Sequence, residues 1–391
     1  MVDFNLRADE EALVARARRV AREVVQPFAK RSDAERVFDK EVIRGVGKEG
    51  LLGGPIKKEW GGLGLSYVAQ ALVYEELGAV DSSVRGFMAV QTGLVASCIQ
   101  EWGNDEQRRR WLPGLCDASL FGCYALTEEE AGSDPAAMAT VAVKDGDDWI
   151  IDGKKIWITN GNVADVAIVF AQADPSAEPR HRGITAFLVP TATAGLEREK
   201  MTAPELGHRG ADHARLVFKS MRVPDAARLG AFGKGFRVAM SALDHGRIGV
   251  AAGAVGVHRA CLEASVAFAR SRRQFGKPIG DFQMVQKTIA DMHVGLEAAR
   301  LLTLKAAWLK DKGLPSTTAT SVAKLYASEA AAKAAHDAVL LHGGRGYNND
   351  YPVERYYRDI VGLEIYEGTS NVQRMIVAGS LLKDGEGKKN A

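Results

Sequence analysis

The sequence predicts an α+β protein with an N-terminal α-helical domain, a middle β domain of barrel or sandwich type and a C-terminal four-helix bundle. Helical periodicity fills the first 120 or so residues, β-rich runs separated by turn residues begin near residue 122, and the helical period returns near residue 234. We therefore expect domains at residues 1–121, 122–233 and 234–391.

The N-terminal third repeats apolar residues near every 3.6 positions in "EALVARARRVAREVV", "SYVAQALVYEELGAV" and "MAVQTGLVASCIQEWG". The segment "GVGKEG" at residues 45–50 matches the G-x-G-x-x-G pattern of dinucleotide sites. That pattern requires a preceding strand and a following helix, whereas this segment closes a helical run. We interpret it as a helix end.

The middle third reads as strands. In "DDWIIDGKKIWITNG" we predict two short strands about a turn at Asp152 and Gly153. The runs "VADVAIVFAQAD", "GITAFLVP" and "ARLVFKSMRVP" continue the β pattern. Beyond them, three long helical runs separated by Gly and Pro predict antiparallel helices of a bundle.

Composition excludes several classes of function. The chain has 391 residues and a formal charge of +2, without a basic stripe interleaved with aromatics, so we expect no nucleic-acid partner. It lacks an apolar run of membrane-spanning length and the apolar core of a signal peptide, so we expect a soluble, cytoplasmic protein. Cys98, Cys116, Cys123 and Cys261 form no C-x-x-C pair, and we predict reduced thiols and no metal site.

Four short segments carry candidate chemistry. In "YEGTSNVQR", Thr369, Ser370 or Asn371 can cap a helix, but capping leaves the carboxylate of Glu367 unexplained. The segments "YALTEEEAGSD", "KKIWITNG" and "SRRQFGKPIGDFQ" each have an ordinary reading as well: a polar loop, a packed sheet face and arginines at a helix C-terminus. Ser321 and Lys324 have the S-x-x-K spacing of a serine nucleophile, but their alanine-rich helix lacks the partner motifs, and we assign them no role.

Taken together, these segments with "ALDHGR" and "LHGGRGYNNDYPVER" resemble the flavin-dependent acyl-CoA dehydrogenase family in order and approximate spacing over nearly the whole chain. The resemblance implies the acyl-CoA dehydrogenase fold, FAD as cofactor, an acyl-CoA substrate, an electron-transferring flavoprotein as electron acceptor, and a homotetramer or homodimer. The resemblance implies neither a metal ion nor a membrane partner.

The resemblance also assigns residues. Those expected to line the flavin are Tyr124, Leu126, Thr127, Gly132, Ser133, Trp157 and Thr159. Those expected to reach the adenosine-diphosphate part of a neighbouring subunit's FAD are Arg272, Gln274, Phe275, Gln283, Gly343 and Gly344. Thr369 and Asn371 match further cofactor contacts. Leu340 stands where many members place a glutamine against the pyrophosphate, so a backbone group replaces that contact or it is lost. Residues matching acyl-CoA contacts are Ser133, Asp244, Arg247 and Gly368.

Glu367 matches the catalytic base of the family. In the implied reaction it removes the proton α to the thioester while the β hydride passes to flavin N5, which gives a trans-2-enoyl-CoA. Some relatives carry the base on a bundle helix instead, but that position is Gly246 here. An apolar setting is expected to raise the pKa of Glu367 towards the working pH.

The acyl group is less constrained. The stretch "VDSSVRGFMAVQTGL" resembles glutaryl-CoA dehydrogenases, in which an arginine matching Arg85 binds a distal carboxylate. An acidic residue associated with that arginine is replaced here by Gly78. We favour a short or branched monocarboxylic acyl-CoA over a dicarboxylic one that would undergo oxidative decarboxylation. The same fold also suits an acyl-CoA oxidase or a dehydrogenase of acyl groups linked to a carrier protein.

Overall fold

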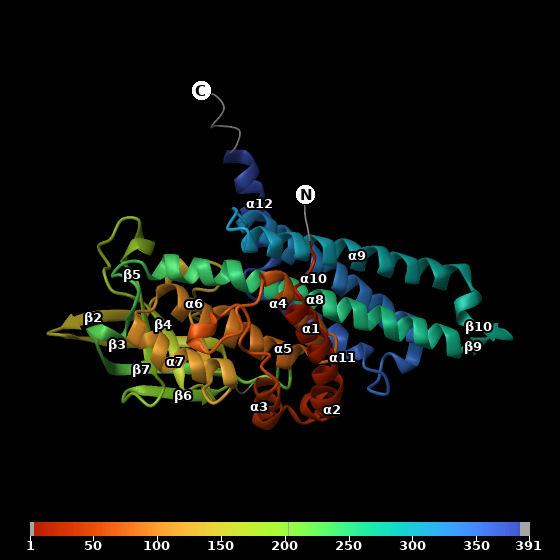
Figure 1. The fold of residues 1–391 in the computed structure, drawn as a ribbon, viewed down its shortest axis with the longest axis horizontal. Coiled ribbons are helices and arrows are strands. Elements are labelled where there is room, and N and C mark those ends of the chain that lie inside the picture. The colour runs from red at the N-terminus through yellow and green to blue at the C-terminus, as the bar shows by residue number, and fades with distance from the viewer. Residues whose placement is uncertain (1–3, 202, 384–391) are drawn as a thin grey trace.

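The computed structural model describes residues 4–201 and 203–383, and it begins with a helical domain (Figure 1). The helices of this part are α1 (Ala8–Val20), α2 (Gln26–Glu35), α3 (Lys40–Lys48), α4 (Tyr67–Gly78), α5 (Ser82–Met88), α6 (Ser97–Trp102) and α7 (Asp105–Asp117). Helix α3 ends inside the G-x-G-x-x-G segment, which confirms its reading as a helix end.

Eight strands follow and form one mixed sheet. They are β1 (Gly122–Ala125), β2 (Val141–Asp145), β3 (Asp148–Thr159), β4 (Val166–Gln172), β5 (Ile184–Pro190), β6 (Leu196–Lys200), β7 (His213–Pro224) and β8 (Arg228–Leu229). Their order is β6-β7-β3-β2-β4-β5-β8, with β1 parallel to β4. Strand β4 is buried along its whole length, as expected of a central strand covered on both faces.

The predicted turn at Asp152 and Gly153 is wrong, because β3 runs through both residues. The turn joins β2 to β3 at residues 146–147, where Gly146 has φ +60°. Gly153, with φ +148°, instead lies at a register shift between β3 and β7. A side chain there would put its Cβ 2.4 Å from Thr140 Oγ1. The glycine therefore permits a bulge rather than a turn.

The C-terminal part is helical again, which confirms the predicted fold class. Its helices are α8 (Gly235–Ser271), α9 (Gln283–Asp311), α10 (Thr317–His342), α11 (Val353–Ile365) and α12 (Ser370–Lys383). Helix α8 extends from beside the sheet to the far end of the molecule, where the short strands β9 (Arg273–Gln274) and β10 (Lys277–Pro278) form a hairpin (Figure 1). The exact domain limits at 121/122 and 233/234 stay a prediction.

Helices α4 and α8 join the N-terminal part to the bundle, and they pack so closely that their backbones are in contact. A Cβ on Gly78 would lie 2.9 Å from the carbonyl oxygen of Gly253, and one on Gly256 would lie 2.3 Å from that of Glu75. Ion pairs flank this contact: Glu76 binds Arg18 of α1 and Arg259 of α8, both at 2.8 Å. Glycine is needed here because any side chain would separate the two helices.

The four cysteines are buried and form no disulfide with one another, which confirms the prediction of packed thiols. Within residues 4–201 and 203–383, no helix is both long and apolar enough to cross a membrane.

Replacing Gly256 with alanine should destabilise the protein, because the added methyl group collides with the backbone of α4. We expect the Gly256→Ala substitution to lower the free energy of unfolding by about 1–3 kcal/mol, a typical cost of overpacking. Chemical denaturation measures the change. Gly379→Ala in α12 is the matched control, since no described atom lies within 4 Å of its would-be Cβ. Equal effects of the two substitutions would contradict the tight α4–α8 contact.

Candidate active site

Glu367 lies in the short turn between α11 and α12. It has a left-handed backbone conformation, with φ +55°, and Gly368 follows with φ +94°. Such a conformation costs a residue other than glycine of order 1–3 kcal/mol, so the surrounding structure must hold it. Thr369 Oγ1 accepts a 3.3 Å hydrogen bond from the Val372 amide, which confirms the predicted helix cap.

The Glu367 carboxylate fills a notch on helix α8. A Cβ on Gly246 would lie 1.9 Å from Glu367 Oε2, so a side chain at 246 and this carboxylate exclude each other. Although Glu367 is only partly buried as a residue, Oε2 is shut off from solvent and has no hydrogen-bond partner among the described residues. An uncommitted oxygen of this kind is free to accept a proton.

Burial and nearby cations act on this carboxylate in opposite directions. Burial raises the pKa of Glu367 to about 7, while Arg85, Arg247 and Lys324 oppose the rise. Burial dominates because an ionised carboxylate loses the solvation of water. The result is a carboxylate that exchanges its proton near neutral pH, as a general base requires.

Arg85 is the first of these cations and is 1% exposed. Its guanidinium donates to the hydroxyl of Tyr366, while Nε and Nη1 have no hydrogen-bond partner among the described residues. Helix α8 accommodates it through Gly253, whose Cβ would lie 2.6 Å from Arg85 Nε. Arg85 therefore lies inside the protein beside the carboxylate, not on a solvated face.

Asp244 and Arg247 flank the notch on α8. Arg247 Nη1 lies 2.7 Å from Asp244 Oδ1, and Asp244 Oδ2 accepts a 2.8 Å hydrogen bond from Thr317 Oγ1 of α10. Arg247 is buried and its Nε has no partner among the described residues. The structure thus pairs the two residues that were predicted to contact substrate, and it places Arg247 close enough to Glu367 to lower the pKa of that carboxylate.

The residues expected at the flavin come from β1, the loop after it and β3. Tyr124 and Leu126 are buried, whereas Gly132 and Ser133 are exposed and Thr127 is between. A buried ion pair shapes this loop: Lys155 Nζ lies 2.7 Å from Glu128 Oε1 and donates to the Leu126 carbonyl at 3.0 Å. The loop is consequently held in one arrangement.

Trp157 and Thr159 belong to the same region of β3. Trp157 is 49% exposed and has φ +59°, next to a register shift between β3 and β7. Thr159 is half-buried, and Ile158 between them points into the core. The irregular strand leaves a large aromatic ring uncovered.

The remaining predicted cofactor residues lie elsewhere. Arg272, Gln274 and Phe275 are at the far end of α8, and Phe275 is 93% exposed. Gln283 begins α9, and Leu340, Gly343 and Gly344 lie at the end of α10, all exposed. At 1.5 Å per residue, Arg272 is roughly 37 Å along α8 from Arg247. Within one chain these residues do not join the Glu367 site.

Sequence reasoning missed Lys324 and Gln373. Both are fully buried, and both donate to the Gly368 carbonyl at 2.9 Å. A signal for Lys324 was available, since it follows Thr320 and precedes Ala327 and Ala331 on the buried stripe of α10. A lone lysine on an apolar helix face needs a hydrogen-bond acceptor or an opposite charge nearby, because burying an unpaired ammonium group is costly.

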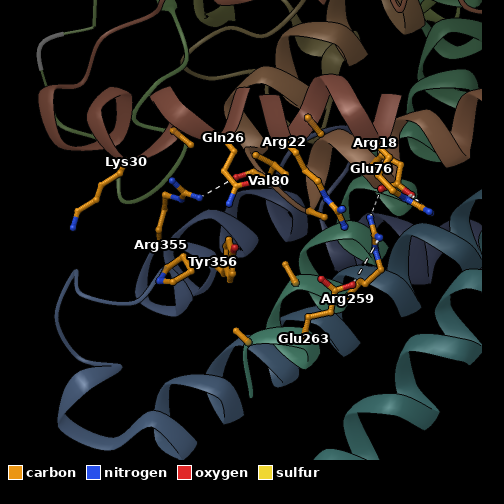
Figure 2. Close-up of a pocket in the computed structure, with 16 residues that line it drawn as sticks. Arg18, Arg22, Gln26, Lys30, Glu76, Val80, Arg259, Glu263, Arg355 and Tyr356 are labelled. Atoms are coloured by element: carbon orange, nitrogen blue, oxygen red, sulfur yellow. Dashed lines mark hydrogen bonds and ion pairs between the residues drawn. The ribbon is translucent and has the colours of Figure 1, made fainter. Parts of the chain in front are cut away.

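A cleft of about 390 Å³ lies apart from these residues, between the first helices and the bundle (Figure 2). Figure 2 shows Arg18, Glu76 and Arg259 along its wall, joined by ion pairs that link α1, α4 and α8. The residues lining it are distinct from those predicted at the flavin or the thioester. Its charges serve the packing of the helices.

Comparison with known families matches the chain in three consecutive parts. Residues 7–119 match the acyl-CoA dehydrogenase N-terminal domain, residues 123–221 the middle domain and residues 233–382 the C-terminal domain.

Individual proteins agree over the full length. The short-chain specific acyl-CoA dehydrogenase of Clostridium acetobutylicum is 40% identical over 98% of this chain and 100% of its own. Butyryl-CoA dehydrogenase from Megasphaera elsdenii has a TM-score of 0.94 and 36% identity, covering 97% of this chain and 100% of the other. A glutaryl-CoA dehydrogenase in complex with glutaryl-CoA has a TM-score of 0.93 and 36% identity, covering 98% and 97%. With its three domains matched in order and its relatives matched end to end, the chain belongs to the acyl-CoA dehydrogenase family.

Proposed function

We propose that the protein is an FAD-dependent dehydrogenase that converts an acyl-CoA thioester into its trans-2-enoyl-CoA. The observation that carries this proposal is the carboxylate of Glu367, held in the notch at Gly246 with a free, solvent-shielded oxygen and a pKa of about 7. The family of the chain and the similarity to short-chain and butyryl-CoA dehydrogenases support the reaction class.

Glu367 acts as the base. Its carboxylate takes the α proton, and the electron pair of the broken C–H bond moves into the thioester as enolate-like charge. The backbone N–H of Glu367 supplies a hydrogen bond to the thioester oxygen that stabilises this charge. Gly246 keeps the notch open for the carboxylate, and Gly368 lets the substrate approach the turn closely.

The exposed residues around the site fit FAD. Trp157 offers an uncovered aromatic face, and a Cβ at Gly132 would meet no described atom within 4 Å, which leaves room for close approach. The same holds for Gly343 and Gly344, which lie away from Glu367 at the end of α10 and would take the distant part of a cofactor bound across two subunits. Thr127 and Ser133 supply hydroxyls, and Thr369 and Asn371 stand at the start of α12, where free amide groups favour a polar group. When bound, the flavin supplies the acceptor for the β hydride.

A second copy of the chain completes the cofactor site in this proposal. Arg272, Gln274 and Phe275 lie far along α8 from Glu367, so one chain cannot bring both ends of the site together. Large apolar side chains stay uncovered on the same helical part, with Met284 83% and Leu340 64% exposed. Such surface is typical of an interface between subunits. We propose a homotetramer, or the homodimer that it contains.

The partner and location follow the family. A dehydrogenase needs an acceptor for the electrons that it takes from its substrate, and we propose an electron-transferring flavoprotein in that role. Asp244 and Arg247 suit the CoA moiety of the substrate. A cytoplasmic location stays a prediction.

For the acyl group we propose a short or branched monocarboxylic chain, in line with the short-chain relative. One observation favours a second candidate: the buried guanidinium of Arg85 has two nitrogens without partners and no carboxylate of the described residues in an ion pair with it. A dicarboxylic acyl-CoA would bring the missing negative charge. The similarity to a glutaryl-CoA dehydrogenase supports this candidate equally well in fold.

Replacing Glu367 with glutamine should leave FAD bound and abolish most of the chemistry. The amide keeps the size of the side chain but cannot accept the proton, so we expect flavin reduction by substrate to slow by ~10²- to 10⁴-fold. Anaerobic stopped-flow measurement of FAD bleaching tests this. Wild-type reduction rates in a variant with a full flavin spectrum would refute the assignment of Glu367.

The rate of substrate-driven flavin reduction should rise with pH through about 7 in the wild-type protein. The active form of Glu367 is the carboxylate and its pKa is raised to about 7, so below that pH the rate should fall tenfold per unit. Measurements between pH 5 and 9 with one saturating substrate test the profile. A midpoint near pH 4.5 would mean that burial does not control the base.

A panel of acyl-CoA substrates separates the two acyl candidates. We expect butyryl-CoA and isobutyryl-CoA to have a higher kcat/KM than glutaryl-CoA in the wild-type protein, and Arg85→Met to leave that order unchanged. The dicarboxylic candidate requires the reverse: glutaryl-CoA as the best substrate, and a loss of roughly 10²-fold or more in its kcat/KM on Arg85→Met, as expected when a buried charge loses its partner. In neither candidate does Arg85 contact the adenosine end of CoA. The affinity for free CoA therefore serves as the control, and Arg85→Met should leave it unchanged.

A further inference from the structure

The turn that carries Glu367 is fastened from two sides by buried polar side chains. Lys324 of α10 donates from Nζ to the Glu364 carbonyl at 3.1 Å and to the Gly368 carbonyl at 2.9 Å. Gln373 of α12 donates from Nε2 to the Glu367 carbonyl at 3.2 Å and to the Gly368 carbonyl at 2.9 Å. The end of α11 and the two residues in the left-handed conformation are thus tied to two different helices.

These hydrogen bonds hold the strained backbone of the turn in place. Glu367 and Gly368 both have positive φ, and nothing in the intrinsic preference of glutamate favours that conformation. Buried carbonyl groups are costly without hydrogen bonds, and here each is paired with a donor from a fixed helix. Releasing the donors would let the turn relax and move the carboxylate out of the notch at Gly246.

Lys324 also brings a positive charge close to the base. Lys324 is fully buried and its pKa is lowered to about 8 by burial, so it stays protonated where Glu367 titrates, near pH 7. The charged and titratable groups that act on this pair from the surrounding elements are Tyr74 of α4, Arg85 of α5, Tyr124 of β1, Arg247 of α8, Glu329 of α10, Glu364 of α11 and Tyr366. Lys324 is the cation among them that hydrogen-bonds to the backbone of the turn, whereas Arg85 donates to the Tyr366 hydroxyl.

We propose that Lys324 is a positioning residue for the proposed reaction: together with Gln373 it fixes the Tyr366–Thr369 turn with the Glu367 carboxylate in the notch, and its charge favours the ionised form of that carboxylate. Gln373 shares the first role and not the second, because it is uncharged. The inference rests on the proposed function of Glu367 as the base that takes an α proton.

A reaction that stops after proton removal isolates the part that Lys324 affects. Methylthioacetyl-CoA has sulfur at the β position and therefore no β hydride to transfer. In D₂O the Glu367 carboxylate takes an α proton, the C–H bond breaks and an O–H bond forms, and a deuteron from exchanged solvent returns to carbon. Mass spectrometry of the recovered thioester gives the exchange rate without any flavin reduction. If the substrate panel selects dicarboxylic chains, carboxymethylthioacetyl-CoA replaces it.

Three variants of the holoenzyme divide the two roles. Lys324→Met keeps the length of the side chain but removes the charge and both hydrogen bonds. We expect its exchange rate to have a midpoint about one pH unit above that of the wild type, the low end of the effect of a nearby opposite charge, and a lower limiting rate. Gln373→Leu should lower the limiting rate without the upward shift of the midpoint, because no charge is removed. Lys333→Met, an exposed lysine of the same helix paired with Asp337, should match the wild type in both respects.

The outcomes are distinguishable. A folded Lys324→Met protein with bound FAD and wild-type midpoint and limiting rate would overturn the inference, as would equal effects of Lys324→Met and Lys333→Met. If Lys324→Met does not fold, Gln373→Leu decides whether hydrogen bonds to the turn position the carboxylate. An unchanged limiting rate overturns that role, and a lowered one with wild-type FAD content supports it. Absence of exchange in the wild-type protein would instead count against the proposed function, because that result does not depend on any substitution at Lys324 or Gln373.

Discussion

The close packing of helix α8 against its neighbours is the constraint on which the site depends. Four glycines recur at intervals of three or four residues along α8 and so share one face. They are Gly246, Gly249, Gly253 and Gly256, and the groups that occupy the space of their missing side chains are the Glu367 carboxylate, the Tyr74 ring, the Arg85 guanidinium and the backbone of α4. The same feature that docks the N-terminal helices on the bundle also makes room for the base and for a buried cation beside it. A larger residue at Gly246, Gly253 or Gly256 would collide with the Glu367 carboxylate, the Arg85 guanidinium or the backbone of α4, respectively.

The electrostatics of the base are shared between the two helical parts. Arg85 belongs to α5, in the N-terminal part, whereas Arg247 and Lys324 belong to α8 and α10 of the bundle. All three lower the pKa that burial raises, and the balance falls at about 7. If either helical part shifted relative to the other, the carboxylate would lose or gain a cation and its pKa would move. The pKa of Glu367 is therefore a property of the packed domains and not of the turn alone.

Much of this organisation could be predicted from the sequence, and the failures have physical reasons. Periodicity predicted the helical, β and helical parts, and the family resemblance pointed to Glu367, which the structure then placed at Gly246. The turn at Gly153 was mispredicted because glycine permits a bulge as readily as a turn, and only strand pairing decides between them. Lys324 was considered only with Ser321 as an S-x-x-K nucleophile pair, and it was given no role because the partner motifs of such a pair are missing from the sequence. Its partners are backbone carbonyls forty or so positions away, and such contacts leave no trace in local sequence.

The contact between α4 and α8 also determines what Arg85 can do. Glutaryl-CoA dehydrogenases have an acidic residue associated with the matching arginine, but at Gly78 even a Cβ would lie 2.9 Å from the backbone of α8, so no carboxylate fits there. The unbalanced charge of Arg85 then acts on Glu367, whose pKa it lowers more than the other two cations do. With an uncharged acyl chain that effect remains in full. A distal carboxylate on the substrate would neutralise Arg85 and raise the pKa of Glu367. Binding such a chain would therefore lower the fraction of Glu367 that is ionised. Under the proposed function, the arginine would therefore link the choice of acyl group to the proton affinity of Glu367.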